Sequence, residues 1–411
     1  MLKTKFNDLL YKMQISGYQN CDYWRLVDKP TCGTVKMTAR VRRLKIISIA
    51  LCVLGLGLPR FWLPQTIAVA NYLLAPCEKQ IQNYWLRRAK RKLSKHIGLI
   101  RIGITGSYGK TSVKNILAAM LSTRYRVVSS PASFNTPMGF ARTVNQNLLP
   151  DTQVLIMEMG ARRPGEIRKM CDLCCPEHGI VTSIGACHLA SFGNVDTVAS
   201  TKGELFAALP SRGIAITDGD NPWCSQLKHP NLILVKSSEQ PHYETTLLGA
   251  HQQKNIQMAA IMASKLGISQ KEIVRVVAEL QPTPHRLEKI IASNGIIVLD
   301  DSYNANPASA TSALEVLNSY STRKVVQTPG FAEQGSNAAV AHAELCEQIK
   351  NVADAVIVVG TLNREYFKKG FSNWYGKVVY VANREMAKQY YPQWLKSGDV
   401  LLILNDIPEQ Y

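Results

Sequence analysis

Acidic residues are scarce at the start of the chain. Residues 1–98 contain 18 Lys and Arg but only 4 Asp and Glu, and the other 313 residues account for only about +4 of the net charge of +18. The excess is therefore local, and it indicates an anionic partner of the N-terminal region, either nucleic acid or a membrane surface. Apolar segments between the basic clusters favour the membrane, so we expect no nucleic acid as a partner.

The sequence also lacks an uninterrupted apolar run long enough to cross a membrane. Residues 46–58 are uncharged but number only 13, whereas a spanning helix needs about 20. A second apolar stretch, 61–76, follows after a proline and an arginine, and basic clusters at 39–45 and 87–95 lie outside both. The pattern predicts an interfacial or re-entrant helical hairpin at the inner face of the cytoplasmic membrane. The alternative is a buried helical pair in a soluble N-terminal domain.

Two other kinds of site are missing from the sequence. The ten cysteines include a C-x-x-C-C cluster at 171–175, but no second C-x-x-C that would complete a zinc site. Free thiols on a helix in a reducing cytoplasm are the better interpretation. The sequence also shows no convincing Ser-His-Asp or Cys-His arrangement, which argues against a protein nucleophile.

What the sequence does contain is a repeated alternation of strand, turn and helix after residue 98. A buried strand is predicted at 154–160, a pair of helices broken at Gly267 over 255–280, and a proline-marked connection at 281–290. Further short apolar strands after 290 predict a second parallel α/β sheet. With 411 residues, we expect a helical N-terminal region (1–98), a central domain with a P-loop and a mostly parallel sheet (99–283), and a C-terminal Rossmann-like domain (284–411).

The stretch "GITGSYGKTS" (103–112) connects a predicted strand to a predicted helix. Its glycines, its lysine and the helix N-terminus after it are suited to bind phosphate, and Thr111 or Ser112 can ligate Mg²⁺. The spacing is shorter than the general G-x-x-x-x-G-K-[ST] loop, because Ile104 stands where the first glycine belongs. A tight turn with a chance Lys-Thr pair is the alternative.

Glu158 ends the strand predicted at 154–160, and ligands of open α/β sheets collect at that edge. A carboxylate there can supply the oxygen ligand that Mg²⁺ needs besides phosphate. His188 follows another strand end, and Lys202 taken alone is most simply a solvated helix residue.

Six motifs in order resemble the Mur ligases, the ATP-dependent ligases that build the peptide of bacterial cell-wall precursors. They are "GITGSYGKTS", "MEMGARRPGEI", "VTSIGACHL", "KGELF", "PHRLE" and "LDDSYNANPAS", and the resemblance covers roughly residues 99 to 411. Within the family the likeness is greatest to the member that adds D-alanyl-D-alanine. The family's loop, T-G-[ST]-x-G-K-[TS], also has the shortened spacing.

The resemblance implies ATP and two Mg²⁺ ions as cofactors, with a CO₂-derived carbamate on Lys202. It assigns catalytic roles to Lys110, Glu158, His188 and Lys202, and metal ligation to Thr111, Glu158, His188 and Lys202. The implied nucleotide-binding residues are Thr105, Gly106, Ser107, Gly109, Lys110, Thr111, Ser112, Asn255, Arg286, Asp301, Asn304 and Asn306. Asn135 and Thr136 match a loop that faces the precursor, and Glu333 and His342 are further candidates for contacting the incoming amine.

The implied reaction joins a carboxylate of a UDP- or lipid-linked muramyl peptide to the amine of an amino acid or a dipeptide. The chain departs from the family in its basic, apolar N-terminal region, in a central segment shorter than expected, and in "QTPGFAEQG" and its ending "LNDIPEQY". These departures suggest a paralogue with another amine or acceptor. The alternatives are a glutamate ligase of the folylpolyglutamate synthase type and a nucleotide-regulated membrane-binding module without catalysis.

Overall fold

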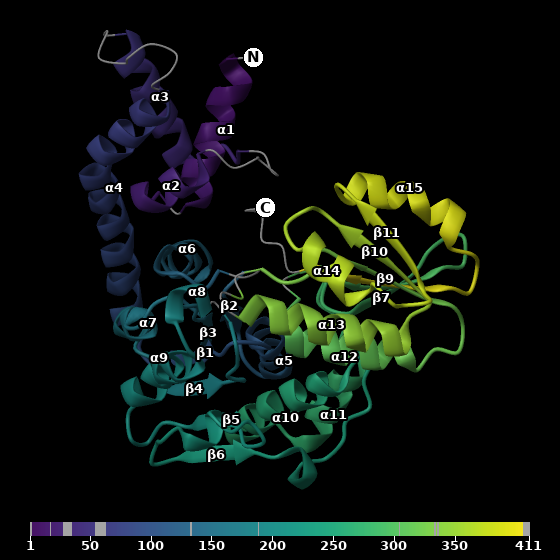
Figure 1. Cartoon of the computed structure of the whole chain (residues 1–411). Coiled ribbons are helices and arrows are strands. Elements are labelled where there is room, and N and C mark those ends of the chain that lie inside the picture. Colours follow the sequence, from purple (N-terminus) through teal and green to yellow (C-terminus); the bar gives the residue numbers. More distant parts are fainter. Residues whose placement is uncertain are drawn as a thin grey trace. The chain divides into compact units, whose positions relative to one another are not determined.

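The structure is a computed structural model that describes residues 2–16, 18–27, 35–53, 63–131, 134–187, 189–303, 305–332, 334 and 337–405. The chain forms two compact units, and the boundary between them lies between Arg87 and Arg88 (Figure 1). The described secondary structure of the first unit is helical. Its helices are α1 (Leu2–Ile15), α2 (Asn20–Leu26), α3 (Ala39–Val53) and α4 (Leu63–Ser94), the last of which continues into the second unit.

Helices α3 and α4 are joined in the first unit by an ion pair, because Nε of Arg43 near the start of α3 lies 2.6 Å from Oε1 of Glu78 on α4. Apolar side chains at helical spacing, including Val41 and Leu44 of α3 and Ile67 of α4, form a core with residues of α1 and α2. Helices α3 and α4 overlap the two apolar stretches of the predicted hairpin, but residues 54–62 between them lie outside the described residues, so the hairpin stays a prediction.

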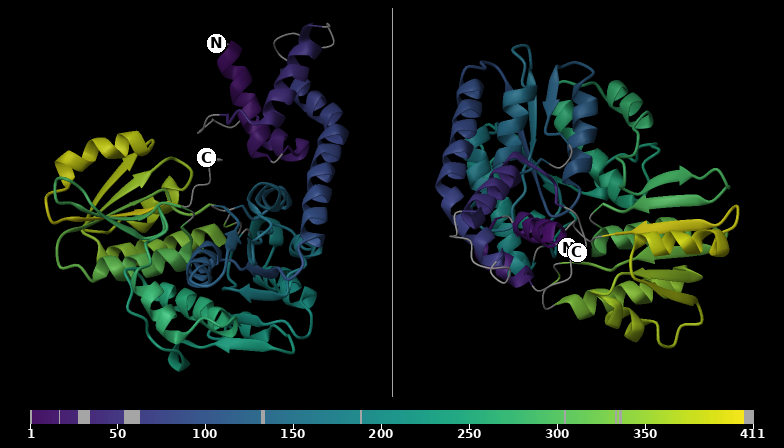
Figure 2. Two further views of the ribbon diagram at one scale, coloured as in Figure 1. Left: turned by 180° about the vertical axis from the view of Figure 1, so that it is seen from behind. Right: turned by 90° about the horizontal axis from the view of Figure 1, so that it is seen from above.

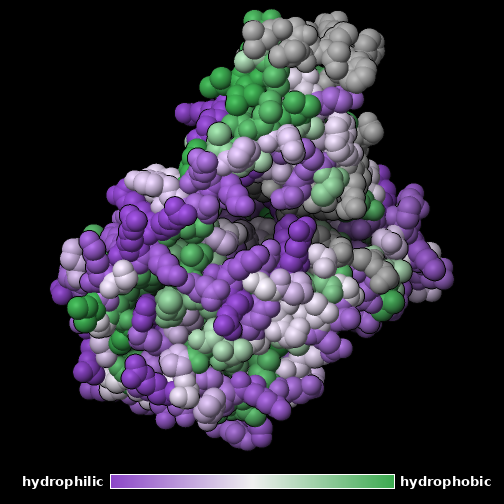
Figure 3. Space-filling model, turned by 90° about the vertical axis from the view of Figure 1, so that its left-hand side faces the viewer, coloured by the Kyte–Doolittle hydropathy of each residue, from purple (hydrophilic) through white to green (hydrophobic). Residues whose placement is uncertain are grey.

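The opposite faces of the same two helices are exposed and apolar. Ile46, Ile49 and Val53 recur at helical spacing on α3, and Val69, Tyr72 and Leu73 do so on α4. Val53 and Tyr72 keep 79% and 74% of their surface accessible. Figure 3 shows apolar residues gathered over the surface of this unit. Among the helices in the described ranges, we find none that is both long and apolar enough to cross a membrane.

The second unit begins with a parallel sheet whose described strands run in the order β2-β3-β1-β4-β5-β6. Helices α5, α10 and α11 cover one face, and α7 and α9 contact the other (Figures 1 and 2). The strands are β1 (Ile100–Thr105), β2 (Val127–Ser129), β3 (Val154–Glu158), β4 (His178–Val181), β5 (Ala215–Asp218) and β6 (Leu232–Val235). The helices are α5 (Lys110–Leu121), α6 (Pro137–Asn147), α7 (Glu166–Cys174), α8 (Leu189–Phe192), α9 (Val195–Ala208), α10 (Ala250–Lys265) and α11 (Gln270–Ala278).

The sheet that follows has the described order β11-β10-β9-β12-β8-β7. Residues of α12, α13 and α14 join the core on one face, and residues of α15 join the core on the other. The strands are β7 (Glu288–Ile291), β8 (Ile297–Asp301), β9 (Lys324–Thr328), β10 (Ala355–Val359), β11 (Lys377–Val381) and β12 (Val400–Leu404). The helices are α12 (Pro307–Asn318), α13 (Ala338–Val352), α14 (Arg364–Gly370) and α15 (Arg384–Trp394).

The prediction of a purely parallel second sheet was wrong at its edge. Strand β7 pairs antiparallel with β8, because only a short turn joins them. In that turn the N–H of Gly295, at φ +78°, donates to the carbonyl of Ala292, and the N–H of Ala292 donates to the carbonyl of Ile296. The α/β class, the parallel first sheet and the break between α10 and α11 agree with the sequence.

Candidate functional site

Two glycines shape the loop between β1 and α5. Gly106 has φ +146° and Gly109 has φ +79°, which L side chains rarely adopt. A Cβ at Gly106 would lie 2.1 Å from Oγ1 of Thr182, and one at Gly109 would lie 2.6 Å from Oδ1 of Asn255. Only glycine fits at either position, and the loop passes directly between the end of β4 and helix α10.

The segment after β4 holds this loop from one side. The backbone N–H of Ser107 donates to the carbonyl of Ser183 over 2.6 Å, and the Ser107 hydroxyl donates to the carbonyl of Gly185 over 3.1 Å. The Tyr108 hydroxyl donates to the carbonyl of Ala186 over 2.7 Å. Cys187 also contacts the loop, with Sγ 3.1 Å from Oγ of Ser107. The loop is therefore fixed before a ligand arrives.

Lys110 is the first residue of α5, and its side chain curls back over the loop. Its Nζ donates to the carbonyls of Gly106 over 2.7 Å and of Ser107 over 3.1 Å. Burial lowers the pKa of Lys110, and the charge of Glu158 opposes that shift. A helix N-terminus, backbone amides and an ammonium group thus converge at one place, as phosphate binding requires.

Thr111 and Glu158 meet at the carboxyl ends of adjacent strands. In the register of β1 and β3, Ile104 lies beside Glu158, so the residues after β1 reach the end of β3. Oγ1 of Thr111 lies 2.9 Å from Oε2 of Glu158. Two neighbouring oxygen ligands of an octahedral Mg²⁺, each at about 2.1 Å from the ion, are separated by about 3 Å. The two side chains therefore fit the first predicted magnesium site.

Lys202 of α9 is not the solvated residue that its position alone indicates, because only 2% of its surface is accessible. Within the described residues its Nζ makes no hydrogen bond or ion pair, and it lies 5.9 Å from the ring of Phe192. Burial and, secondarily, the charge of Lys110 lower its pKa to about 8. The charge of Glu204 acts in the opposite direction and raises the pKa of Lys202. The Glu204 carboxylate itself accepts hydrogen bonds from backbone N–H groups at the start of α7.

Arg286 lies on the connection to the second sheet, and Asp301 ends β8. The guanidinium of Arg286 lies 4.5 Å from the ring centre of Tyr303, and it attracts Asp301 and Glu158. Asp301 is buried, and its Oδ2 has no hydrogen-bond partner among the described residues. Burial raises the pKa of Asp301 to about 6, against the attraction of Arg286. An unpaired buried acceptor fits a ligand hydroxyl, as the ribose role requires.

Hydrogen bonds of His285 with Asp300 and Glu288 fix the backbone next to Arg286. His285 has φ +63°, and its Nδ1 lies 2.8 Å from Oδ2 of Asp300. The N–H of His285 donates to the Glu288 carboxylate over 3.2 Å. These three side chains are close enough to bind a metal ion. Their mutual hydrogen bonds explain the cluster without one.

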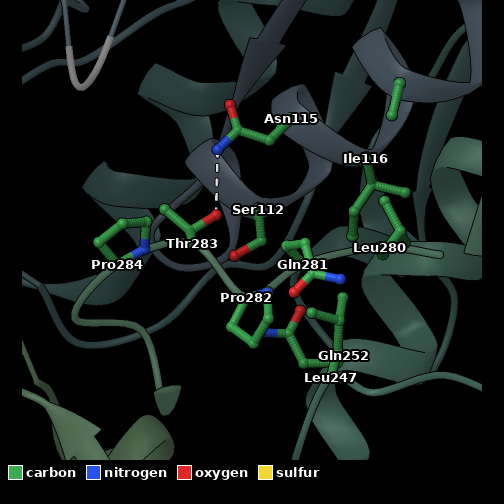
Figure 4. Close-up of a pocket in the computed structure, with 11 residues that line it drawn as sticks. Ser112, Asn115, Ile116, Leu247, Gln252, Leu280, Gln281, Pro282, Thr283 and Pro284 are labelled. Atoms are coloured by element: carbon green, nitrogen blue, oxygen red, sulfur yellow. Dashed lines mark hydrogen bonds between the residues drawn. The ribbon is translucent and has the colours of Figure 1, made fainter. Parts of the chain in front are cut away.

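A pocket of about 330 Å³ lies beside α5 and the connection to the second sheet (Figure 4). It is lined by Ser112, Asn115, Ile116, Ala119, Leu247, Gln252, Leu280, Gln281, Pro282, Thr283 and Pro284. The Asn115 amide donates to the Thr283 hydroxyl over 3.0 Å across one side of it. Gln252 in turn accepts a hydrogen bond from Asn255 over 3.1 Å, which connects this pocket to the predicted adenine contact.

The remaining predicted residues have mixed placements. Thr105 is buried and donates to the carbonyl of Met159, whereas Thr136 and Asn306 cap α6 and α12. Asn135 was predicted to lie on a loop that faces the precursor. Its amide donates to Oε1 of Glu158 over 3.1 Å. His188 and Asn304 lie outside the described residues.

His342 and Glu333 were further candidates for contacting an amine. Glu333 lies outside the described residues. His342 is fully buried, and its Nε2 accepts the N–H of Phe331 while its Nδ1 lies 2.6 Å from the carbonyl of Ala338. Nε2 therefore holds the loop after β9, and Nδ1 contacts the first residue of α13, so both ring nitrogens already have partners within the chain.

The sequence did not reveal several residues at this site. The most important is Lys114, which is fully buried against Glu158. The others are Gln252 and residues 281–284, which line the pocket. The helical spacing of Lys114 from Lys110 and Thr111, four and three residues, could have placed it on the same face of α5.

Comparison with known families identifies the family of the chain. A family model of the Mur ligase middle domain matches residues 104–232, and one of the Mur ligase, glutamate ligase domain matches residues 285–405. The chain belongs to the Mur ligase family. The resemblance inferred from the six motifs is thereby confirmed. The loop after β1 and Glu158 lie in the matched middle domain, and Arg286 and Asp301 lie in the matched glutamate ligase domain.

Among curated proteins, this Mur ligase family member is similar to UDP-N-acetylmuramoyl-tripeptide–D-alanyl-D-alanine ligases. It is 31% identical to that of Escherichia coli (strain K12) over 63% of this chain and 64% of the relative. It is also 31% identical to that of Mycobacterium tuberculosis (strain H37Rv), over 64% of this chain and 59% of the relative. The chain thus spans about three fifths of the length of these relatives.

Solved structures share the fold of this family member. The MurF ligase of Thermotoga maritima in complex with ADP superposes with a TM-score of 0.71 at 23% identity, covering 79% of this chain and 80% of the other. A MurF structure from Acinetobacter baumannii gives a TM-score of 0.71 at 21% identity, over 79% and 78% of the two chains. The two TM-scores show that the fold is shared.

Proposed function

We propose that the chain is an ATP-dependent ligase that forms an amide bond on a cell-wall precursor. The observation that carries this proposal is the cluster around the loop after β1. Lys110, Lys114 and Arg286 all act electrostatically on one carboxylate, Glu158, and this local surplus of positive charge suits the polyphosphate of a nucleotide. The curated relatives are named as ligases of a UDP-muramoyl tripeptide and D-alanyl-D-alanine, which identifies the substrate classes to test first.

The proposed reaction has two steps. A substrate carboxylate attacks the γ-phosphoryl group of ATP, which gives an acyl phosphate and ADP, and the free amine of an amino acid or dipeptide then displaces phosphate. Lys110 and the loop amides would bind the β- and γ-phosphates, and Arg286 and Asp301 would bind phosphate and ribose. Mg²⁺ held by Thr111 and Glu158 would neutralise the phosphate charge. The protein contributes positioning and charge, because the reaction requires no protein nucleophile.

We also propose that Lys202 reacts with CO₂ to become a carbamate. The neutral amine adds CO₂ and loses a proton, so that a buried cation becomes a carboxylate-like anion. Lys202 is buried without an anionic hydrogen-bond partner among the described residues, and its pKa is about 8. Both support this step, because they favour the neutral, reactive amine. The carbamate would serve with His188 as a ligand of a second Mg²⁺.

The proposed function is tested by product analysis. The purified chain is incubated with ATP, Mg²⁺, a UDP-linked or lipid-linked muramyl tripeptide, and D-alanyl-D-alanine or single amino acids. We expect ADP release that requires both the carboxylate and the amine, and a mass-spectrometric product equal to their sum minus water. ATP turnover that continues without the amine, with no amide product, would contradict the proposal. Folate with glutamate serves as the control for the folylpolyglutamate type.

We further propose that the N-terminal unit holds the chain at the inner face of an anionic membrane. Six large apolar side chains, on α3 and α4, are exposed on the faces opposite the core of this unit. Cationic side chains begin within one turn of this apolar face, with Arg42 exposed and Lys45 half-buried on α3. Apolar burial combined with attraction to anionic headgroups is the physical basis of interfacial binding. A lipid-linked acceptor would then lie at the same surface.

Replacing Ile46 and Ile49 together by glutamate is expected to lower vesicle binding at least about tenfold, because each exchange removes apolar burial and adds repulsion from anionic lipid. Flotation with vesicles containing phosphatidylglycerol measures the bound fraction, and vesicles of phosphatidylcholine alone should bind less. Val274→Glu on α11 is the matched control, since Val274 is a similarly exposed apolar residue far along the chain. Unchanged flotation of the double variant would contradict the membrane proposal.

A further inference from the structure

Lys114 is a fully buried lysine that lies directly against Glu158. It follows Lys110 and Thr111 by one helical turn on α5, so all three lie on the same side of that helix. Its side chain and that of Glu158 are each only 1% accessible, and Nζ lies 3.5 Å from Oε2 of Glu158. The Nζ also donates to the carbonyl of Ser130, just after β2, over 2.8 Å.

The Glu158 carboxylate is shared among several groups. Its Oε2 accepts the Thr111 hydroxyl over 2.9 Å and faces Lys114, while its Oε1 accepts the Asn135 amide over 3.1 Å. Both oxygens are therefore held in place. A buried carboxylate is strongly unfavourable without a counter-charge, and Lys114 supplies one at close range.

The same arrangement sets a condition on metal binding. A divalent ion at Thr111 and Glu158 would lie close to the Lys114 ammonium, and like charges repel strongly in a buried site. Nucleotide phosphates bring the additional negative charge that offsets this repulsion. We propose that Lys114 is a resident counter-ion of Glu158 that makes metal binding at this position depend on a bound nucleotide. The inference rests on the proposed function, because it takes the nucleotide to bind at the loop after β1.

Metal affinity without nucleotide tests this role directly. The full-length protein and its Lys114→Gln and Lys114→Met variants are titrated with Mn²⁺, and free Mn²⁺ is followed by electron paramagnetic resonance, with and without ADP. Glutamine keeps a donor for the Ser130 carbonyl but removes the charge, whereas methionine removes both. We expect both variants to bind Mn²⁺ without ADP at least about tenfold more tightly than the unsubstituted chain. The gain in affinity on adding ADP should shrink correspondingly.

Two further variants separate charge from structure. Lys114→Arg keeps the charge and should retain weak Mn²⁺ binding without ADP, and Lys114→Gln combined with Glu158→Gln should lose the gained affinity. Circular dichroism selects the variants that are folded. Folded Lys114→Gln that binds Mn²⁺ no more tightly than the unsubstituted chain would overturn the inference. Failure of the proposed function is distinguishable, because it appears as missing amide product and leaves the nucleotide-free titration unchanged.

Discussion

Replacement of Lys110 by alanine is expected to lower kcat/KM for ADP formation by about 100- to 1,000-fold or more. The ammonium group lies 2.7 Å and 3.1 Å from two carbonyls of the loop after β1, where it would bind the β- and γ-phosphates. Its charge is needed most when negative charge shifts during phosphoryl transfer, so kcat should fall as well as affinity. Coupled measurement of ADP release gives kcat and KM, and calorimetry gives the Kd of ADP.

Lys271→Ala is the matched control for Lys110→Ala, because Lys271 is exposed at the start of α11. The control should leave both kinetic constants and ADP binding unchanged. If Lys110→Ala bound ADP and formed product like the unsubstituted chain, the loop would not be the phosphate site. The turn interpretation of "GITGSYGKTS" would then replace the enzymatic one.

Lys202→Ala is expected to reduce product formation at least about 100-fold, because it removes the amine that would carry the carbamate. Short carboxylic acids such as acetate should restore part of the activity, since they can enter the vacated space and supply an anionic oxygen. Lys202→Arg serves as the control that fills the space but cannot react with CO₂. Equal activity in Lys202→Ala and the unsubstituted chain would exclude the proposed ligand role.

The same lysine gives a pH dependence with a defined sign. Its folded-state pKa of about 8 lies below the ordinary value of 10.5, so the folded chain favours the neutral amine. At pH 7 about a tenth of the amine is neutral, and at pH 9 about nine tenths. With limiting bicarbonate, carbamate formation should therefore increase from pH 7 to pH 9. Carbon-13 NMR with labelled bicarbonate measures it, and Lys202→Ala should lack the carbamate signal.

Local patterns allowed the loop after β1 and its neighbour Glu158, the proposed phosphate side of the site, to be located from the sequence. Gly106, Gly109, Lys110 and Thr111 are contiguous, and their conformation follows from the loop itself. Glu158 was predictable because the carboxyl ends of parallel strands share one edge, and the register of β1 and β3 realises that rule.

Tertiary surroundings account for what was missed. A lysine on a helix is ordinarily solvated, so neither the burial of Lys202 nor that of Lys114 could be deduced from helical pattern alone. Strand β7 is short and mostly accessible, which gives it a weak strand signal before its pairing with β8 is known. The pocket combines α5 with residues 281–284, which are more than 160 positions later in the sequence.

Oδ2 of Asp301, which has no hydrogen-bond partner in the part of the chain that the structure describes, has a practical consequence for inhibitor chemistry. A compound that places a hydroxyl or amide hydrogen against this atom gains a bond that no described residue makes, whereas one that offers only hydrocarbon leaves a desolvated acceptor behind. Sugar-like scaffolds should for that reason outperform flat aromatic replacements at this end of the site.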